Sequence, residues 1–339
     1  MKKYVLFIGI DISKKWIDVA ITFDGIKENM SHKRFANTSK GFKTMLNWLK
    51  KDYPDLVDAQ ALIFCMEHTG IYSIPLCSFL QEQSLDYVLE SALQIKRSIG
   101  IQRGKSDKAD SKAIARYAYL FRKDLKACKL PSKSLFKLKH LLAFRGRLLK
   151  RLNSLRSVAK EMALFMKDDE AVDLIVEESD DLVKLIKAKI KKVELLMDQI
   201  VKEDAQLNRL FELATSVKGI GRINALHLII HTNCFTSFSS WRKFACYIGI
   251  APFEHRSGTS LNRPPKVSKL GHKKLKTVVS SGVMAAIRHD KELKAYYERK
   301  LAEGKNKYKV INAVKNKLIS RVFAVVKRGT PYVEILRYA

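Results

Sequence analysis

Short apolar runs rich in β-branched residues mark the first 90 residues of the chain. Residues 4–12 (YVLFIGIDI) and 16–24 (WIDVAITFD) are joined by a three-residue connector, which predicts a β-hairpin. A more polar strand is expected over 29–36. The continuous apolar run at 61–66 (ALIFCM) is typical of a strand buried on both faces, and residues 87–90 are expected to form a short strand.

Helical periodicity separates and follows these strands. Spacings of three and four residues between apolar positions predict helices over 40–51, 71–83 and 106–121. The resulting order, β-β-β-α-β-α-β-α, is that of a mixed α/β sheet domain, which we place at residues 1–130.

The pattern changes to long helices in residues 131–213, where Pro and Gly are almost absent. Apolar residues recur every three or four positions from Leu135 to Leu155 and again from Leu174 to Ile200. Two long helices are predicted, either as an antiparallel hairpin or as a coiled coil between chains. The third segment, 214–339, is expected to be mainly helical, with one extended loop over 251–269.

The charge balance points to a polyanionic partner. The chain has 64 Lys and Arg against 34 Asp and Glu, a formal net charge of +30, and residues 214–339 alone hold 25 basic and 6 acidic residues. Such an excess favours nucleic acid, because each neutralised phosphate releases counterions. A membrane surface is the weaker alternative. In the tail 291–328 the basic face could bind nucleic acid or simply be solvated.

Membrane and redox features are not expected. No stretch approaches 18 apolar residues, and Asp11 interrupts the first apolar run too early for a signal peptide, so we expect no membrane partner and a cytoplasmic protein. The five cysteines form no CxxC pair, which predicts reduced thiols without a disulfide or a zinc site.

Four carboxylates stand out by their placement. Asp11 ends the first strand, Glu67 ends the buried strand, and Asp107 and Asp110 lie three residues apart at the start of the third helix. Each alone could be a strand end or a helix cap. Together they predict a cluster of hard oxygen ligands, which suits Mg²⁺ or Mn²⁺. Two such ions about 4 Å apart can stabilise both oxygens of a phosphodiester cleavage.

Other polar residues near these four are interpreted more cautiously. Asp18 and Asp24 fall within a strand and at a turn, and we take them as structural. His68 could shuttle a proton or could simply be exposed. Arg103 and Lys105 precede the acidic helix and could approach a phosphate.

At this point the residues resemble a known family. The segments GIDISKKWIDVA, CMEHTGIYS and QRGKSDKADSKAIARYA are similar to the N-terminal domain of DEDD-type insertion-sequence transposases, relatives of the Piv-type site-specific invertases that include bridge-RNA-guided recombinases. SVKGIGRINALHLI and FACYIGIAPFEHRSGTSLNRPPKVSKLGHKKLK are similar to the second domain of that family. The resemblance spans most of the chain and is weakest in the helical middle.

The resemblance implies a fold and a mechanism. The N-terminal domain is expected to be RNase H-like (RuvC-like), with Asp11, Glu67, Asp107 and Asp110 as metal ligands, followed by a helical coiled-coil middle and a mainly α C-terminal domain. Ser257, in the motif HRSGTS, corresponds to a serine that attaches covalently to DNA. The implied partners are DNA, a structured guide RNA, and further copies of the chain in a dimer or tetramer.

The residues themselves support Ser257 only modestly. It precedes a glycine in a basic loop whose cations could stabilise charge on a phosphoryl group, but a serine needs activation. His255 is nearby, and a plain DNA contact or an exposed side chain is the favoured interpretation. Where the family pattern usually reads Gly-Asn and Leu-Arg, this chain has Gly271-His272 and Leu275-Lys276, so a bidentate phosphate contact is lost.

A glycine-containing turn at 217–221 adds a further candidate contact. It resembles a helix-hairpin-helix turn, whose free N–H groups bind phosphate, although a plain turn between helices is the alternative. The complete set of candidate nucleic-acid-binding residues is Arg103, Lys105, Lys218, Arg222, Arg256, Arg263, Lys266, Lys269, Lys273 and Lys276.

Three functions fit these observations to different degrees. A transposase or recombinase with a serine–DNA intermediate fits best. A RuvC-like nuclease or junction resolvase would use metal-activated water and leave Ser257 structural. A non-enzymatic architectural protein is opposed by the complete set of four carboxylates.

Overall fold

The computed structural model describes residues 4–68, 70–100, 106–166, 169–257 and 261–334, without the side chains of residues 255–257 and 261–263. The chain divides into two compact units, Met1–Leu130 and Pro131–Ala339. Each unit has its own hydrophobic core, so each is described by itself. None of the helices in the described ranges is long and apolar enough to cross a membrane.

The first unit is built on a five-stranded mixed sheet in the order β3-β2-β1-β4-β5. β1 pairs antiparallel with β2, and β2 with β3, whereas β1, β4 and β5 run parallel. The strands are β1 Leu6–Ile12, β2 Trp16–Thr22, β3 Ser31–Ala36, β4 Leu62–Glu67 and β5 Tyr87–Glu90. This mixed sheet is consistent with the expected RNase H-like N-terminal domain.

Helices pack against this sheet and supply the rest of its core. They are η1 Lys27–Asn29, α1 Ser39–Asp52, α2 Pro54–Asp58, η2 Gly70–Ser73, α3 Ile74–Glu82, α4 Ala92–Ile99 and α5 Asp107–Leu120. The predicted helix over 71–83 starts as the 3-10 turn η2, and Pro75 stands in the first turn of α3, where its missing N–H costs nothing. The short helices α2 and α4 were not predicted from the sequence.

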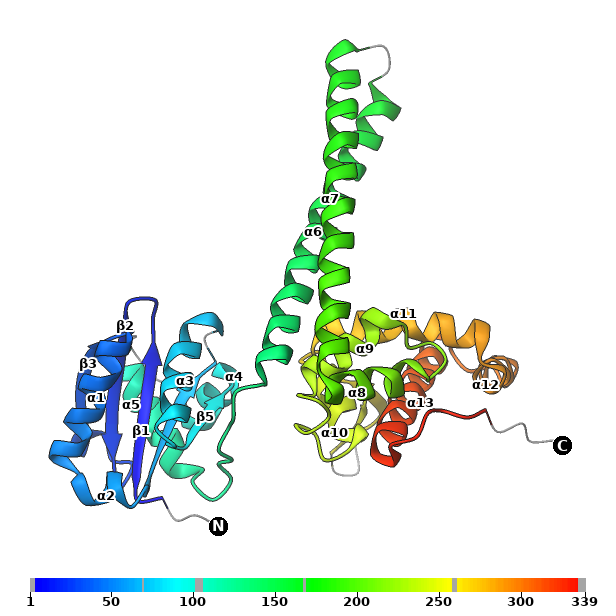
Figure 1. Ribbon diagram of the computed structural model, residues 1–339. Coiled ribbons are helices and arrows are strands. Elements are labelled where there is room, and N and C mark those ends of the chain that lie inside the picture. The colour runs from blue at the N-terminus through cyan, green and yellow to red at the C-terminus, as the bar shows by residue number, and fades with distance from the viewer. Residues whose placement is uncertain (1–3, 69, 101–105, 167–168, 258–260, 335–339) are drawn as a thin grey trace. The chain divides into compact units, whose positions relative to one another are not determined.

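The second unit begins with two long helices that pack along each other (Figure 1). These are α6 Lys133–Phe165 and α7 Glu170–Glu203. Ser132 caps α6 by accepting a hydrogen bond from the Leu135 N–H, and Asp169 caps α7 through the Ala171 N–H. Leu152 packs against Val183 and Ile190 in the seam between the two helices.

Shorter helices complete the second unit around a core of aliphatic and aromatic residues. They are α8 Ala205–Thr215, α9 Arg222–His231, α10 Trp241–Ile248, α11 Lys273–His289, α12 Lys291–Ala302 and α13 Lys307–Arg328. The segment predicted to be an extended loop over 251–269 instead contains an antiparallel pair, β6 Pro252–Ser257 and β7 Leu261–Val267. The loop prediction was wrong there, because Pro264 and Pro265 do not prevent pairing in a two-stranded ribbon whose outer edge needs no N–H donors.

Candidate functional site

Two of the predicted carboxylates lie at the same edge of the sheet. β1 and β4 are parallel neighbours in the register Ile10 to Met66, so Asp11 and Glu67 follow at adjacent positions. Glu67 is in turn opposite Glu90 at the end of β5. Glu90 accepts a hydrogen bond from the Tyr117 hydroxyl at 3.0 Å, which gives it a structural partner.

The start of α5 is brought over this edge by a close approach at Gly9. A Cβ atom on Gly9 would lie 2.3 Å from the Ser111 carbonyl oxygen and 2.1 Å from the Ala115 nitrogen, so only glycine allows this contact. Gly9 and Asp11 lie on the same face of β1, because side chains alternate along a strand. The first turn of α5 holds Asp107 and Asp110, and Ser106 caps it through the Ala109 N–H.

The pKa of Asp11 reflects both its burial and the acids around it. Its pKa is raised to about 6, first by burial and then by the negative charges of Asp110, Asp107, Glu67 and Asp18, in that order. Burial and the repulsion from the neighbouring carboxylates both disfavour the charged form of Asp11. A bound cation would remove this repulsion.

A fifth acid near Asp11, Asp18, belongs to a cluster of charged residues that the sequence analysis did not predict. Asp18 is paired across the hairpin with Asp11 and is only 2% exposed. His32 Nε2 lies 2.8 Å from its Oδ1, and Arg34 Nε donates to its Oδ2 at 2.9 Å. The same guanidinium donates from its NH2 group to Asp107 Oδ2 at 2.9 Å, so Arg34 joins the buried acid to the start of α5.

These residues can be compared with the needs of a metal ion. Within the described ranges, no group of three or more His, Cys, Asp or Glu side chains is arranged to hold one. The donor set is nevertheless chemically suitable, because carboxylate oxygens are the preferred ligands of Mg²⁺ and Mn²⁺. The raised pKa of Asp11 is the observation that favours a cation here, and Arg34 is the positive charge that now contacts one of the four acids.

Flanking residues of the first unit contribute less. His68 is exposed beyond the end of β4, and its backbone N–H donates to the Glu90 carbonyl. The predicted phosphate contacts Arg103 and Lys105 lie outside the described residues.

The predicted serine lies in the β6–β7 ribbon of the second unit. Ser257 is the last residue of β6 and pairs with Leu261, the first residue of β7. The backbone therefore presents Ser257 at the closed end of the ribbon. The side chains of Ser257, His255, Arg256 and Arg263 are not among those described.

The candidate basic residues differ in their surroundings. Lys218 forms an ion pair with Glu334 at 2.7 Å, and Arg222 is paired with Asp198 and Glu194 of α7. Three further candidates, Lys266, Lys269 and Lys273, are exposed.

Two more contacts involve α11. The Lys276 ammonium donates to the Gly249 carbonyl at 3.1 Å. In the turn between α8 and α9, Gly219 has a φ of +95°, and a Cβ there would lie 2.6 Å from the Gly282 carbonyl of α11. Gly219 is thus required for the turn and for close packing, which a phosphate contact alone would not demand.

Two family models match the chain. A model of DEDD-type IS110 elements, described as a transposase, matches residues 8–162. A second, described as the transposase IS116/IS110/IS902 family, matches residues 211–298. The first match includes Asp11, Glu67, Asp107 and Asp110, and the second includes Ser257.

Curated relatives agree with these matches. A pilin gene-inverting protein of Moraxella bovis is 25% identical over 330 residues, covering 96% of this chain and 97% of the relative. An uncharacterized 43.6 kDa protein of insertion element IS110 from Streptomyces coelicolor is 30% identical over 135 residues, 38% of this chain and 33% of its own length. A probable family 20 transposase of Pseudomonas aeruginosa is 26% identical over 161 residues, 47% of this chain and 46% of its own.

Proposed function

Because the chain belongs to the IS110 family of transposases, enzymes that act on DNA, we propose that it cleaves and rejoins DNA through a covalent serine–DNA intermediate at Ser257, aided by a divalent cation at the carboxylate cluster. The observation that supports the proposal is the adjacent placement of Asp11 and Glu67 at the ends of β1 and β4, with the pKa of Asp11 raised by burial and then by the negative charges of the acids around it. The full-length similarity to a gene-inverting protein makes inversion as well as transposition a candidate outcome.

The metal would be held by Asp11, Glu67, Asp107 and Asp110. When bound, a divalent cation supplies positive charge that offsets the negative charge developing on a phosphodiester during cleavage. The protein supplies the positions of the acids: the parallel β1–β4 pairing fixes Asp11 beside Glu67, and the contact at Gly9 fixes α5. Arg34 holds Asp107 toward the same edge.

The serine step conserves atoms and electrons. A bond forms between the Ser257 Oγ and a DNA phosphorus atom, and the bond from that phosphorus to a deoxyribose oxygen breaks. The serine proton ends on the released deoxyribose hydroxyl, and nothing is oxidised or reduced. Attack by a different deoxyribose hydroxyl on the serine phosphodiester rejoins the strand and restores the serine.

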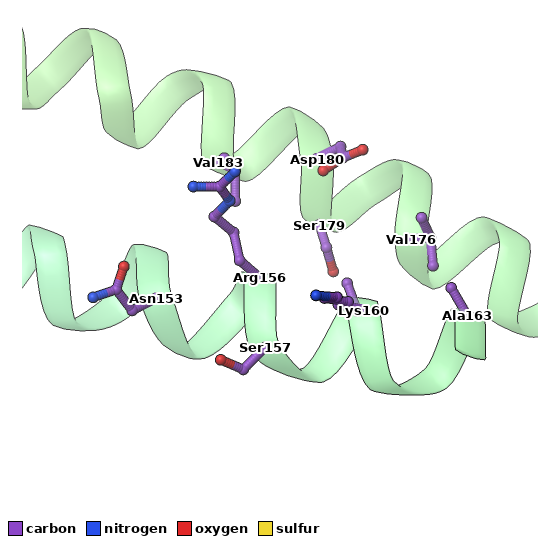
Figure 2. Close-up of a pocket in the computed structure, with 10 residues that line it drawn as sticks. Asn153, Arg156, Ser157, Lys160, Ala163, Val176, Ser179, Asp180 and Val183 are labelled. Carbon is purple, nitrogen blue, oxygen red and sulfur yellow. The ribbon is translucent and has the colours of Figure 1, made fainter. Parts of the chain in front are cut away.

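Further copies of the chain are part of the proposal. The distal ends of α6 and α7 expose large apolar side chains, including Phe165 at 81%, Leu174 at 60% and Leu164 at 58%. Between these helices lies a groove lined by Arg156, Lys160, Ser179 and Asp180 (Figure 2). An exposed apolar stripe beside a charged groove is typical of a surface that pairs with another chain. We expect a dimer or tetramer through α6 and α7, measurable by light scattering on the eluting protein.

A structured guide RNA is the second proposed partner. The basic excess of residues 214–339 suits any nucleic acid and does not favour RNA over DNA. The guide RNA is therefore supported by the resemblance of the motifs to the family. An electrophoretic shift with RNA transcribed from the noncoding DNA beside the gene tests it. Binding no tighter than to an unrelated RNA of equal length would remove the guide from the proposal.

A covalent-trapping assay tests the central proposal. Protein and Mg²⁺ are mixed with labelled DNA containing the element's junction, together with the noncoding transcript, and separated under denaturing conditions. We expect a labelled protein–DNA adduct that is lost in Ser257→Ala and Asp11→Ala and retained in the matched controls Ser281→Ala and Asp58→Ala. Cleaved DNA without an adduct, unchanged by Ser257→Ala, would instead support the hydrolytic nuclease or resolvase.

A further inference from the structure

A cavity of about 470 Å³ lies in the second unit, between α13 and the segment that leads from α9 into α10 (Figure 1 locates these helices). Its volume falls within the range of about 300–1,000 Å³ that is usual for ligand sites. Four half-buried aromatic side chains line it, and we name it the aromatic pocket after them: Phe235, Phe238, Trp241 and Phe323.

The turn that follows α9 has an unusual backbone, which positions one wall of the pocket. Asn233, Cys234 and Phe235 have φ angles of +48°, +55° and +61°, a region that residues with a side chain rarely adopt. The Phe235 N–H donates to the Thr232 hydroxyl oxygen at 2.9 Å, which holds the turn. The Phe235 ring then meets the Phe323 ring edge-on, with centroids 5.2 Å apart. Such strained turns are commonest where the position of a side chain matters for function.

Two hydroxyl groups in the lining of the pocket are available to a ligand. Ser239 and Ser320 line it together with the aromatic rings. Among the residues that the structure describes, neither side-chain hydroxyl makes a hydrogen bond. A hydroxyl can both donate and accept, so it can pair with the polar edge of an aromatic ligand.

The charged side chains next to the aromatic rings are cationic. Lys327 lines the pocket, and the Arg242 guanidinium lies over the Trp241 ring, 4.8 Å from its centroid. Both cations are exposed, and within the described ranges neither has an acidic partner. The pocket therefore combines an aromatic lining with a positive surround.

A smaller cavity of about 270 Å³ adjoins the pocket and shares Trp241 and Ser320 with it. Lys317 lines this second cavity and is exposed. The acid that lines it, Glu292, is already paired with Arg321. Lys317 is thus a further cation close to the pocket.

These features fit a nucleobase better than an apolar side chain. Aromatic rings stack on the faces of any unstacked base, and cations beside them contact the phosphates. A base within a duplex is excluded, because its faces are covered by its neighbours. An aromatic side chain of a second copy, such as Phe165, which is 81% exposed, would fill the apolar part but leave the hydroxyls and the cations without partners.

We propose that the aromatic pocket binds an unpaired, unstacked base of DNA. Ser239 and Ser320 hydrogen-bond to the edge of the base, and Lys327 contacts a neighbouring phosphate. The inference rests on the proposed function for its ligand, since unpaired bases arise where DNA strands are cut and exchanged. Because stacking accepts every base, the pocket distinguishes unpaired from paired DNA and not one sequence from another.

Duplex DNA with a single unpaired thymine is the probe, because an unpaired base leaves the stack at little cost. The control DNA carries an abasic site at the same position. Fluorescence anisotropy with the full-length protein, in the absence of divalent cations, gives both dissociation constants. We expect the wild type to bind the unpaired thymine about fivefold more tightly than the abasic site.

Variants of the pocket test where this preference comes from. Ala324→Tyr fills the pocket from an exposed position of α13, and Trp241→Leu removes one wall; both should lower the ratio of the two constants to about one. Lys327→Gln should weaken both DNAs equally and keep the ratio. Tyr308→Leu, an exposed aromatic residue of α13 outside the pocket, should change neither. Ala324→Tyr decides the test if Trp241→Leu does not fold.

The other outcomes overturn the pocket or its occupant. A ratio of about one in the wild type, or an unchanged ratio in Ala324→Tyr, overturns the pocket. Loss of a dimer in Ala324→Tyr by light scattering, with the ratio intact, assigns the pocket to a second copy and also overturns it. A preference shown only by an RNA duplex of the same design overturns the choice of DNA.

Failure of the pocket and failure of the proposed function can be told apart. If the trapping assay yields an adduct while the wild type shows no preference for the unpaired base, the pocket fails and the serine mechanism stands. If the preference is present and lost in Ala324→Tyr while no adduct forms, the serine mechanism fails and the pocket stands.

Discussion

Arg34 is the residue on which the arrangement of the carboxylate cluster depends most directly. Its guanidinium contacts the buried Asp18 and the first-turn Asp107 at the same time. A lysine could not do both, because a single ammonium lacks the planar fork of donors that bridges two acceptors. Breaking a buried ion pair by removing one partner is costly, since the remaining charge stays buried without its counter-ion.

Substitution of Arg34 therefore tests the cluster without touching a proposed metal ligand. We expect Arg34→Gln to lower the free energy of unfolding of the metal-free protein, by less than the loss of a fully buried pair would, because Arg34 is half exposed and His32 still contacts Asp18. Added Mg²⁺ should recover more stability in Arg34→Gln than in wild type, because Asp107 is then free to ligate. Urea unfolding measures both, with Lys43→Gln as the control. Equal stability of the two variants would contradict the role of Arg34.

Histidines of the second unit predict an acid sensitivity. The ordinary pKa of a histidine is 6.5. Burial, and then the charges of neighbouring cations, lower the pKa of His227 to about 3. Burial, and then the charges of His272 and nearby lysines, lower the pKa of His231 to about 4. Between these values the unfolded chain binds more protons than the folded one, so stability is full above pH 6.5 and falls as the pH drops toward 4. Each histidine contributes at most roughly 1.4 kcal/mol per pH unit.

We expect His231→Gln to flatten this slope between pH 6 and pH 4.5, measured by urea unfolding at several pH values. His140→Gln, an exposed histidine of α6, should leave it unchanged. The raised pKa of Asp11, about 6, acts in the opposite sense, because stability from its protonated form is lost as pH rises from 4 to 6. The test therefore compares the slope of the unfolding free energy against pH in His231→Gln with the slope in His140→Gln. Identical slopes in the two variants would show that His231 is protonated in the folded protein.

At the scale of elements, the contact of α5 with β1 decides whether the four acids meet. Gly9→Ala would place a Cβ 2.1 Å from the Ala115 nitrogen, so α5 must move away from the sheet. We expect a loss of roughly 1–3 kcal/mol, typical of overpacking, together with weaker stabilisation by Mg²⁺. Thermal unfolding with and without Mg²⁺ measures both. Gly221→Ala is the control, since its Cβ meets open space and its φ is −79°. An unchanged response to Mg²⁺ in Gly9→Ala would separate the position of α5 from metal binding.

Elements with a strong period were predictable from the sequence, and those held by tertiary contacts were not. The strands β1, β2, β4 and β5 follow from apolar runs, and the positions of Asp11 and Glu67 at strand ends follow with them. The β6–β7 ribbon was missed because its residues are basic and proline-containing, and its strands are stabilised by pairing with each other. The mixed sheet itself agrees with the expected fold class.

The cluster of Asp18, His32 and Arg34 had only a weak signal in the sequence. Arg34 lies 16 residues from Asp18 and 73 from Asp107, and only the pairing of β2 with β3 and the packing of α5 bring them together. An aspartate in the middle of a strand, with a cation at the opposite position of the next strand, is the weak pattern that could have indicated it.

For the whole molecule, the distribution of charge assigns different tasks to the two units. Residues 214–339 hold 25 basic and 6 acidic residues, whereas the first 130 hold 22 basic and 14 acidic residues. Much of the first unit's acidic charge lies at the edge that carries the carboxylate cluster, where it repels phosphate unless a cation is present. Non-specific attraction to DNA is thus expected mainly from the second unit.

Separate expression of the units tests this division, because each has its own hydrophobic core. We expect 131–339 to bind a 30-base-pair duplex, with an affinity that falls steeply between 50 and 200 mM salt, since the logarithm of the binding constant drops by about 0.9 per phosphate contact for each tenfold rise in salt. Residues 1–130 should bind at least tenfold more weakly in the absence of divalent cations, and Mg²⁺ should narrow that gap by neutralising the carboxylates. Fluorescence anisotropy at four salt concentrations measures all three quantities. If 1–130 bound as tightly as 131–339 without Mg²⁺, the acidic edge would not repel DNA, and the need for a cation there would lose its electrostatic basis.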